Sequence, residues 1–398
     1  MMATIPISTE DELVAAIRDA RDAGRKLEVV GAGTKRNYGC PLDTCDVLDL
    51  SGLSGITSYE PEELVLTARA GTPLAEIEAV LAERHQRLGF DPADWGPLFG
   101  APANAGTIAG ALSADTSGSA RIRYGAARDH LIGFRAVNGF GEAYKGGGRV
   151  VKNVTGFDLP KLMCGAMGTL GAFSEVTLRL VPRAPRAVTF AVKDIVPEQG
   201  LILLRRIWAT ALEPTGLAYI PACASDGFAD LGDIGAGAAL IRIEGAREAL
   251  TEKRAALRSM LHGEDLIDGE DGDVLFAQVG AGAAFAGRPA DIWRIAVPPS
   301  ESVTTAQALA GTQWYADWAG GLFWVELSES DHVAATRLRH IAARANGSAT
   351  LLRASAATRA VIPVFPPEPQ ARATLTRAVK AAFDPLGLFN PGRMFEGV

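Results

Sequence analysis

Near the start of the chain, the spacing of apolar residues changes from that of a helix to that of a strand. Thr9 and Glu12 are spaced as a capping box, and apolar residues then recur at helical intervals at Leu13, Ile17 and Ala20. Gly24 is placed to end this helix, and Lys26–Val30 predicts a short strand. We therefore expect a helix and then a strand that runs directly into the glycine-containing stretch Gly31–Lys35.

Two more strands and a second helix are predicted before residue 90. The strands are Asp46–Leu50 and Leu64–Ala70. Thr72 as the cap and Pro73 at the first position then open a helix. Its inward-facing residues are Leu74, Ile77 and Leu81.

After residue 182 the pattern becomes a regular alternation of strands and helices. The predicted strands are Arg186–Val192, Gly216–Ile220, Ala238–Ile243, Trp293–Val297, Gly321–Leu327 and Thr350–Ala354. The predicted helices are Glu198–Ala209, Arg247–Leu261 and Asp331–Ala345. Such alternation with hairpin returns favours an antiparallel sheet with helices on one face. Five aromatic residues gather here, and they fit either a core or a pocket: Trp293, Trp314, Trp318, Phe323 and Trp324.

Three separated passages are rich in glycine: Gly31–Lys35, Ala105–Gly110 and Gly168–Phe173. Glycine at such density suits backbone that takes positive φ or approaches another group closely. Exposed backbone N–H groups in such loops hold phosphate without help from side chains. Each passage alone also fits an ordinary tight turn, and that alternative stays open for each.

The first passage does not fit a Rossmann site. That motif needs a strand, three spaced glycines and a helix that begins at the loop. Here the third glycine is absent, and Arg36–Pro41 is a poor start for a helix. We reject the Rossmann interpretation.

Taken together, the motifs resemble a known superfamily. The three glycine passages, Arg123–Gly125, Lys152–Asp158 and the tail Asp384–Gly392 are similar to those of the vanillyl-alcohol-oxidase, or PCMH-type, FAD-binding flavoproteins. Within that superfamily the chain most resembles the FAD-binding subunits of bacterial glycolate oxidases. The resemblance covers about residues 1–182 and the last fifteen or so.

The resemblance implies an α+β fold in three parts. Residues 1–182 would form a PCMH-type FAD-binding domain of two α/β subdomains, and residues 183–375 an antiparallel-sheet cap domain with helices on one face that binds substrate or a partner. Residues 376–398 would return to the FAD domain. Helix Gln370–Phe383 is predicted where that return begins.

The resemblance also implies which residues contact FAD. They are Gly31, Ala32, Gly33, Thr34, Lys35, Gly106, Thr107, Ile108, Gly110, Ser113, Gly118, Tyr124, Gly125, Gly168, Gly171 and Phe173. Some relatives attach the flavin covalently through a histidine just after the first glycines, where this chain has Thr34 and Lys35. Non-covalent FAD is therefore expected.

Composition narrows the classes of partner. The net charge is −7 and the basic residues are scattered, which argues against a nucleic-acid partner. The four cysteines form no CxxC pair or cluster-binding spacing, so an iron–sulfur centre would belong to another chain. The acidic start of the chain is not typical of a signal peptide, and no apolar run reaches membrane-spanning length. We expect a cytoplasmic protein, with membrane association through partners left open.

The acid–base residues of catalysis are not evident. The five histidines never pair at i, i+2 or i, i+4, so no metal site is expected. Lys152 could stabilise charge on a reduced flavin, or pair with Asp158 in a structural ion pair. Asn390 and Arg393 are further candidates at the mouth of the site. The catalytic residues stay unknown at this level.

Three functional hypotheses follow. The first is an FAD-binding subunit of a glycolate, or other 2-hydroxy acid, oxidase or dehydrogenase complex. Its partners would be a larger FAD-binding catalytic subunit and an iron–sulfur subunit that accepts electrons. The second is a self-contained FAD-dependent alcohol or hydroxy-acid oxidoreductase. The third is a non-catalytic scaffold subunit that has lost FAD.

Overall fold

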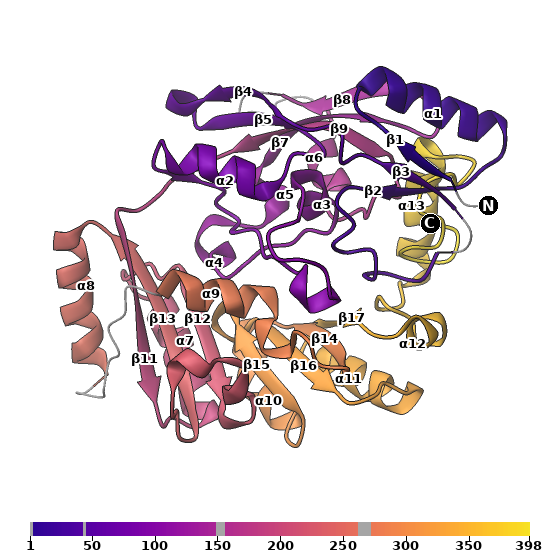
Figure 1. The fold of residues 1–398 in the computed structure, drawn as a ribbon. Helices are drawn as coiled ribbons and strands as arrows, with labels where there is room; N and C mark the ends of the chain where they lie inside the picture. Colours follow the sequence, from indigo (N-terminus) through magenta and orange to yellow (C-terminus); the bar gives the residue numbers. More distant parts are fainter. Residues whose placement is uncertain (1–2, 43–44, 149–155, 262–271) are drawn as a thin grey trace. The chain divides into compact units, whose positions relative to one another are not determined.

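The computed structural model describes residues 3–42, 45–148, 156–261 and 272–398, and these form two compact units (Figure 1). Unit 1 comprises residues 1–116, 125–182 and 367–398. Unit 2 comprises residues 117–124 and 183–366. The division after residue 182 falls where the composition changes, but the return to unit 1 starts at Pro367, nine residues before the expected 376. The short segment 117–124 groups with unit 2.

Unit 1 contains three sheets within the described residues. A parallel sheet has the order β1-β3-β2, and an antiparallel sheet has the order β4-β5-β9-β7-β8 (Figure 1). A two-stranded sheet pairs β10 with β6. The strands are β1 Thr4–Pro6, β2 Leu27–Val30, β3 Asp46–Asp49, β4 Ile56–Glu60, β5 Val65–Arg69, β6 Gln86–Arg87, β7 Leu131–Val137, β8 Ala143–Gly147, β9 Ala172–Arg179 and β10 Val181–Pro182. The helices are α1 Glu10–Asp22, α2 Leu74–Ala82, α3 Ile108–Ser113, α5 Ala127–His130, α6 Leu159–Met163 and α13 Gln370–Phe383.

The first helix forms as its sequence predicts. The Thr9 side chain accepts from the Glu12 backbone N–H, and the Glu12 carboxylate accepts from the Thr9 backbone N–H. The apolar face of α1 is buried in one core cluster together with residues of β2, β3 and the C-terminal segment. A separate cluster packs α2 and α3 against β5, β7 and β9. At α2 the cap is Pro73 rather than Thr72, because the Thr72 hydroxyl bonds to the carbonyls of Arg69 and Gly55 instead.

The tail is fixed to unit 1 by a buried ion pair. Lys380 Nζ lies 2.8 Å from Asp384 Oδ2 and also donates to the carbonyls of Thr169 and Phe389. Asp384 accepts from the backbone N–H groups of Leu388 and Phe389. Because both charges are buried and fully bonded, α13 and the segment after it hold one position against the third glycine passage.

Unit 2 is a seven-stranded antiparallel sheet, within the described ranges, of order β11-β13-β12-β15-β16-β14-β17 (Figure 1). The strands are β11 Arg186–Lys193, β12 Gly216–Pro221, β13 Gly237–Gly245, β14 Asp291–Ala296, β15 Gln313–Asp317, β16 Leu322–Leu327 and β17 Ser348–Arg353. The helices are α4 Arg121–Tyr124, α7 Pro197–Trp208, α8 Arg247–Met260, α9 Gly272–Ala281, α10 Ser302–Ala308, α11 His332–Arg344 and α12 Ala356–Val361.

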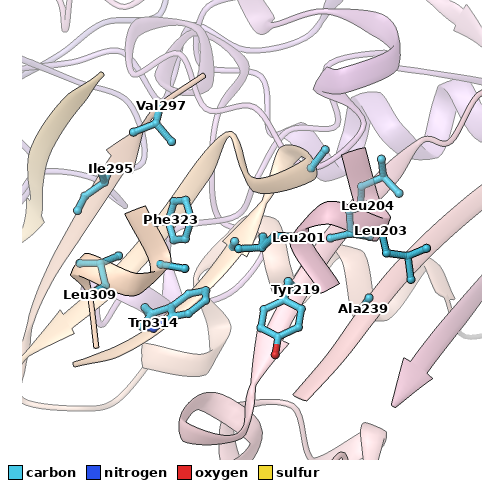
Figure 2. Packing of buried hydrophobic residues seen from close by; sticks show 14 of the residues in the cluster. Leu201, Leu203, Leu204, Tyr219, Ala239, Ile295, Val297, Leu309, Trp314 and Phe323 are labelled. Carbon is cyan, nitrogen blue, oxygen red and sulfur yellow. The ribbon is translucent and has the colours of Figure 1, made fainter. Parts of the chain in front are cut away.

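One face of this sheet carries the core of unit 2. Alternate strand residues pack against α7, α8, α10 and α11, and Figure 2 shows Leu201 of α7 close to Tyr219 and Phe323. Trp293 and Ile295 of β14 also belong to this cluster. The residue between them, Arg294, is therefore on the opposite face. Strand β15 and helices α9 and α10 were not predicted from the sequence.

Candidate functional site

The first glycine passage leaves the end of β2 as a series of turns, with no helix, as its sequence predicts. Gly33 has φ +72°, a conformation that favours glycine. A Cβ at Gly31 would lie 2.5 Å from Thr107 Oγ1 of the second passage. Because Gly31 has no side chain, the first and second passages can lie this close to one another.

Lys35 ends this loop, with its ammonium group beside the second passage. Its Nζ lies 3.3 Å from Thr34 Oγ1, and 3.9 Å from the positions that a Cβ would take at Gly106 and at Gly110. Burial lowers the pKa of Lys35 to about 8, and the charge of Asp94 opposes that shift. No carboxylate forms an ion pair with Lys35 within the described ranges. The loop therefore presents a positive charge on which Asp94 acts but which no ion pair within the described ranges neutralises.

The second passage is the start of a helix rather than a continuous loop. The Thr107 side chain caps α3 by accepting from Gly110 N–H at 3.3 Å. The sequence interpretation treated Ala105–Gly110 as non-helical because of its glycines. The helix forms because Ile108 and Leu112 are fully buried in the core of unit 1, and this burial outweighs the low propensity of Gly110.

The third passage bends sharply at two glycines. Gly168 has φ +69°, and a Cβ there would lie 2.8 Å from Asn390 Nδ2. At Gly171 a Cβ would lie 2.8 Å from the carbonyl oxygen of Val137. The close approaches at both glycines are to the protein itself, which the sequence alone did not distinguish from an approach to a ligand.

Two residues of the C-terminal segment connect these loops. Asn390 accepts from Val29 N–H at 2.9 Å and donates to the Met167 carbonyl at 2.6 Å. Arg393 pairs with Glu28 at 2.8 Å, and its guanidinium also donates to the Arg36 carbonyl at 2.8 Å. Both side chains are buried. Asn390 therefore links β2 to the third passage, and Arg393 links the first loop to the C-terminal segment.

A cleft of about 810 Å³, part of it open to solvent, lies among these segments. Residues from all three passages line it: Gly31, Ala32, Gly33, Thr34, Lys35, Thr107, Gly110, Ser113, Gly168, Gly171 and Phe173. Of the described lining residues, Lys35, Arg36 and Arg393 are cationic and Glu28 is the one carboxylate, a net charge of +2. A cleft rich in backbone groups and positive in charge suits a ligand with a diphosphate.

Comparison with known proteins agrees with this geometry. Residues 3–147 match the family model of an FAD binding domain. The glycolate oxidase subunit GlcE of Escherichia coli (strain K12) is 32% identical over 383 residues, which is 96% of each chain. The chain belongs to the GlcE family. This family and its FAD binding domain make it an FAD-dependent oxidoreductase chain, with FAD as its cofactor.

More distant relatives share part of the GlcE family sequence or only its fold. The glycolate oxidase subunit GlcD of Bacillus subtilis (strain 168) is 30% identical over 154 residues, 38% of this chain and 31% of that one. A crystal structure of p-cresol methylhydroxylase with substrate bound aligns over 99% of this chain and 88% of its own, with a TM-score of 0.75 and 13% identity. The predicted α+β fold of the PCMH type is confirmed.

Five of the expected cofactor residues of this GlcE-family chain do not line the cleft. Gly106 lies just before the α3 cap, and Ile108 points into the core. Gly125 belongs to unit 1 outside the cleft lining, whereas Gly118 and Tyr124 belong to unit 2. Conversely, the sequence interpretation missed Glu28 as a lining residue. The sequence did contain an indication of this position, because Glu28 is the one acidic residue in the otherwise apolar strand Leu27–Val30.

Of the catalytic candidates, Lys152 lies outside the described residues. Asp158, with which it was expected to pair, forms an ion pair with Lys161 at 2.6 Å. Asn390 and Arg393 line the cleft, but the bonds described above occupy their polar groups. Within the described ranges, no helix has the length and apolar composition needed to cross a membrane.

Proposed function

We propose that this chain is the FAD-binding subunit of a glycolate, or related 2-hydroxy acid, oxidase complex. Electrons would pass from the substrate through the flavin to an iron–sulfur subunit, and a larger FAD-binding subunit would complete the enzyme. The observation that carries the proposal is the cleft bordered by three separated glycine passages, in a chain that matches a glycolate oxidase subunit over nearly its full length.

The charge of the cleft is complementary to that of FAD. A diphosphate carries two negative charges, which match the net +2 of the described lining. We assign the diphosphate to the segment Gly31–Lys35 and to Gly110, and the remainder of FAD to Thr107, Ser113, Gly168, Gly171 and Phe173. When bound, FAD supplies the two-electron acceptor that oxidation of a hydroxyl group requires.

We assign the polar residues of the cleft to binding FAD and to positioning the loops around it, and not to proton transfer. Lys35 provides the one lining ammonium group, and it has no carboxylate partner within the described ranges. We assign Asn390 and Arg393 the role of holding the loops in place. Both are buried; Asn390 bonds to the backbone of β2 and of the third passage, and Arg393 bonds to Glu28 and to the Arg36 carbonyl. A proton acceptor for the substrate hydroxyl would come from the larger subunit.

The test is to purify the chain alone and together with its two expected partners. Bound flavin is measured by its visible absorption, and glycolate is then added without oxygen. We expect the chain alone to be yellow, and its flavin to be reduced by glycolate only in the complex. Reduction in the isolated chain would favour a self-contained oxidoreductase, and a colourless chain that refuses added FAD would favour a scaffold.

A further inference from the structure

A second cleft lies within unit 2, where β12 ends and β15 begins. Its volume is about 1250 Å³, part of it open to solvent, and all of its lining residues belong to unit 2. The two strands pair at Tyr219 and Ala316. Two residues further along this antiparallel register come Pro221 and Trp314, which line the cleft and are not joined among the described strand pairings. Because proline has no N–H to donate to a neighbouring strand, the sheet opens at this point.

Trp314 provides an unused hydrogen-bond donor in this cleft. It is 4% exposed and packs against Tyr219 and Phe323, with ring centroids 6.0 and 5.3 Å away. Its indole Nε1 makes no hydrogen bond within the described residues but retains some contact with solvent. A buried indole N–H ordinarily has a partner. Since Trp314 lines the cleft, an acceptor that enters the cleft can receive this bond.

The other walls of the cleft are apolar surfaces of two helices. Val196 and Pro197 lie at the start of α7, and Val303 and Ala306 lie on the facing side of α10. Val196 is 44% exposed, so a large apolar side chain at the rim is left in contact with water. Covering such surface with another apolar group is favourable, and exposed apolar clefts of this kind mark binding surfaces.

The charge of the cleft limits what it can bind. Glu198 is the one charged residue of the described lining, and it forms no ion pair within the described residues. A fatty acid or an anionic phospholipid would bring a second negative charge beside this carboxylate, whereas a lysine or arginine would be attracted to it. The lining therefore favours a polypeptide segment that is apolar and carries a basic residue.

We propose that this cleft binds a segment of a partner subunit in which an apolar side chain lies beside a lysine or arginine. The apolar side chain enters the cleft, a backbone carbonyl accepts from Trp314 Nε1, and the basic group pairs with Glu198. This inference rests on the proposed function, because it requires the multi-subunit complex, and it assigns to unit 2 a surface that contacts the partner.

Cys223 offers a probe of the cleft in the unaltered chain. It is exposed and lines the cleft, whereas Cys40 is half-buried and Cys45 and Cys164 are buried. Alkylation by N-ethylmaleimide, followed by peptide mass spectrometry, measures whether the Cys223 thiol is accessible. We expect fast alkylation in the isolated FAD-loaded chain, and alkylation about tenfold slower or more in the complex with the two expected partner subunits.

Three substitutions test the contacts, with binding to the partner subunits measured by calorimetry. Ala310→Trp fills the cleft from an exposed lining position and should weaken binding about tenfold or more. Trp314→Phe keeps an aromatic ring but removes the N–H, and should weaken binding about two- to tenfold. Glu198→Gln should reduce the salt dependence of binding. Ala343→Trp is the matched control, because Ala343 is an exposed alanine of α11 outside the cleft lining. Near-ultraviolet circular dichroism verifies that each variant is folded.

Equal alkylation of Cys223 in the isolated chain and in the complex would overturn the inference, as would wild-type affinity in Ala310→Trp. Resistance of Cys223 to alkylation in the isolated chain would also overturn it, because the chain itself or a second copy would then cover the cleft. Protection by phosphatidylglycerol vesicles but not by the subunits would overturn it in favour of a lipid. A chain that forms no complex with either subunit would instead contradict the proposed function, so the two failures are distinguishable.

Discussion

FAD affinity should depend on the protonation of Lys35, since this is the lining cation for which the described residues provide no carboxylate. Replacing it by methionine keeps most of the side-chain volume and removes the charge. A hydrogen bond to a charged group contributes about 1.5–3 kcal/mol, so Lys35→Met should weaken FAD binding about 10- to 150-fold at pH 7. Lys145→Met is the control, because Lys145 is an exposed lysine of the same unit.

The pH dependence has a definite sign. The pKa of Lys35 without FAD is about 8, so the ammonium form that attracts a diphosphate predominates below that pH. FAD affinity should be constant from pH 6 to 7 and fall as the pH rises through 8. At pH 9 about one molecule in ten still carries the proton, so affinity should be about tenfold lower than at pH 7.

The assay is equilibrium titration of FAD-free chain with FAD, followed by flavin fluorescence between pH 6 and 9. Lys35→Arg is the informative variant, because arginine stays protonated over this range and should give a flat profile. Lys35→Met should also be flat, but at weaker affinity. A wild-type profile as flat as that of Lys35→Arg would refute the assignment of Lys35 to the diphosphate.

Three further outcomes are expected. Lys380→Met leaves the buried Asp384 carboxylate without its cation and should lower the free energy of unfolding by about 3–5 kcal/mol, measured by urea denaturation. The double variant with Asp384→Asn should recover part of that loss. A double variant that recovers none of it would contradict the stabilising role of the Lys380–Asp384 ion pair. Gly110→Leu should abolish FAD retention without changing the circular dichroism spectrum, so a yellow variant would contradict the placement of FAD beside Gly110. Ala319→Gly removes a side chain from a residue with positive φ, and this gain offsets the lost burial, so the free energy of unfolding should change by less than about 0.5 kcal/mol. Ala316→Gly, in the buried strand β15, has no such gain and should lower it by about 1–2 kcal/mol. Thermal denaturation measures both changes.

Local signals in the sequence predicted most elements, and the exceptions have a physical cause. Helix α13 was predicted at its observed bounds, and the predicted strands of unit 2 agree with the structure within a few residues, because each of those strands is a short run rich in apolar residues. Strand β15 was missed because its five residues include the polar Gln313 and Asp317 and no β-branched residue.

All three glycine passages border one cleft. Of the expected glycines, Gly33, Gly110 and Gly171 line it and Gly106 does not. However, the tight contacts at Gly31 and Gly171 are with other parts of the chain, so these glycines are needed to bring the loops together. The pairing of Arg393 with Glu28 joins residues 365 positions apart and could not be derived from spacing.

The order in which the chain is synthesised has a consequence for loading of the cofactor. The first loop and the strand before it emerge early from the ribosome, but the side chains that hold them, Asn390 and Arg393, are translated only after all of unit 2. A chain that stops before Asn390 lacks these contacts. We therefore expect it to hold flavin less tightly than a chain that includes Asn390 and Arg393.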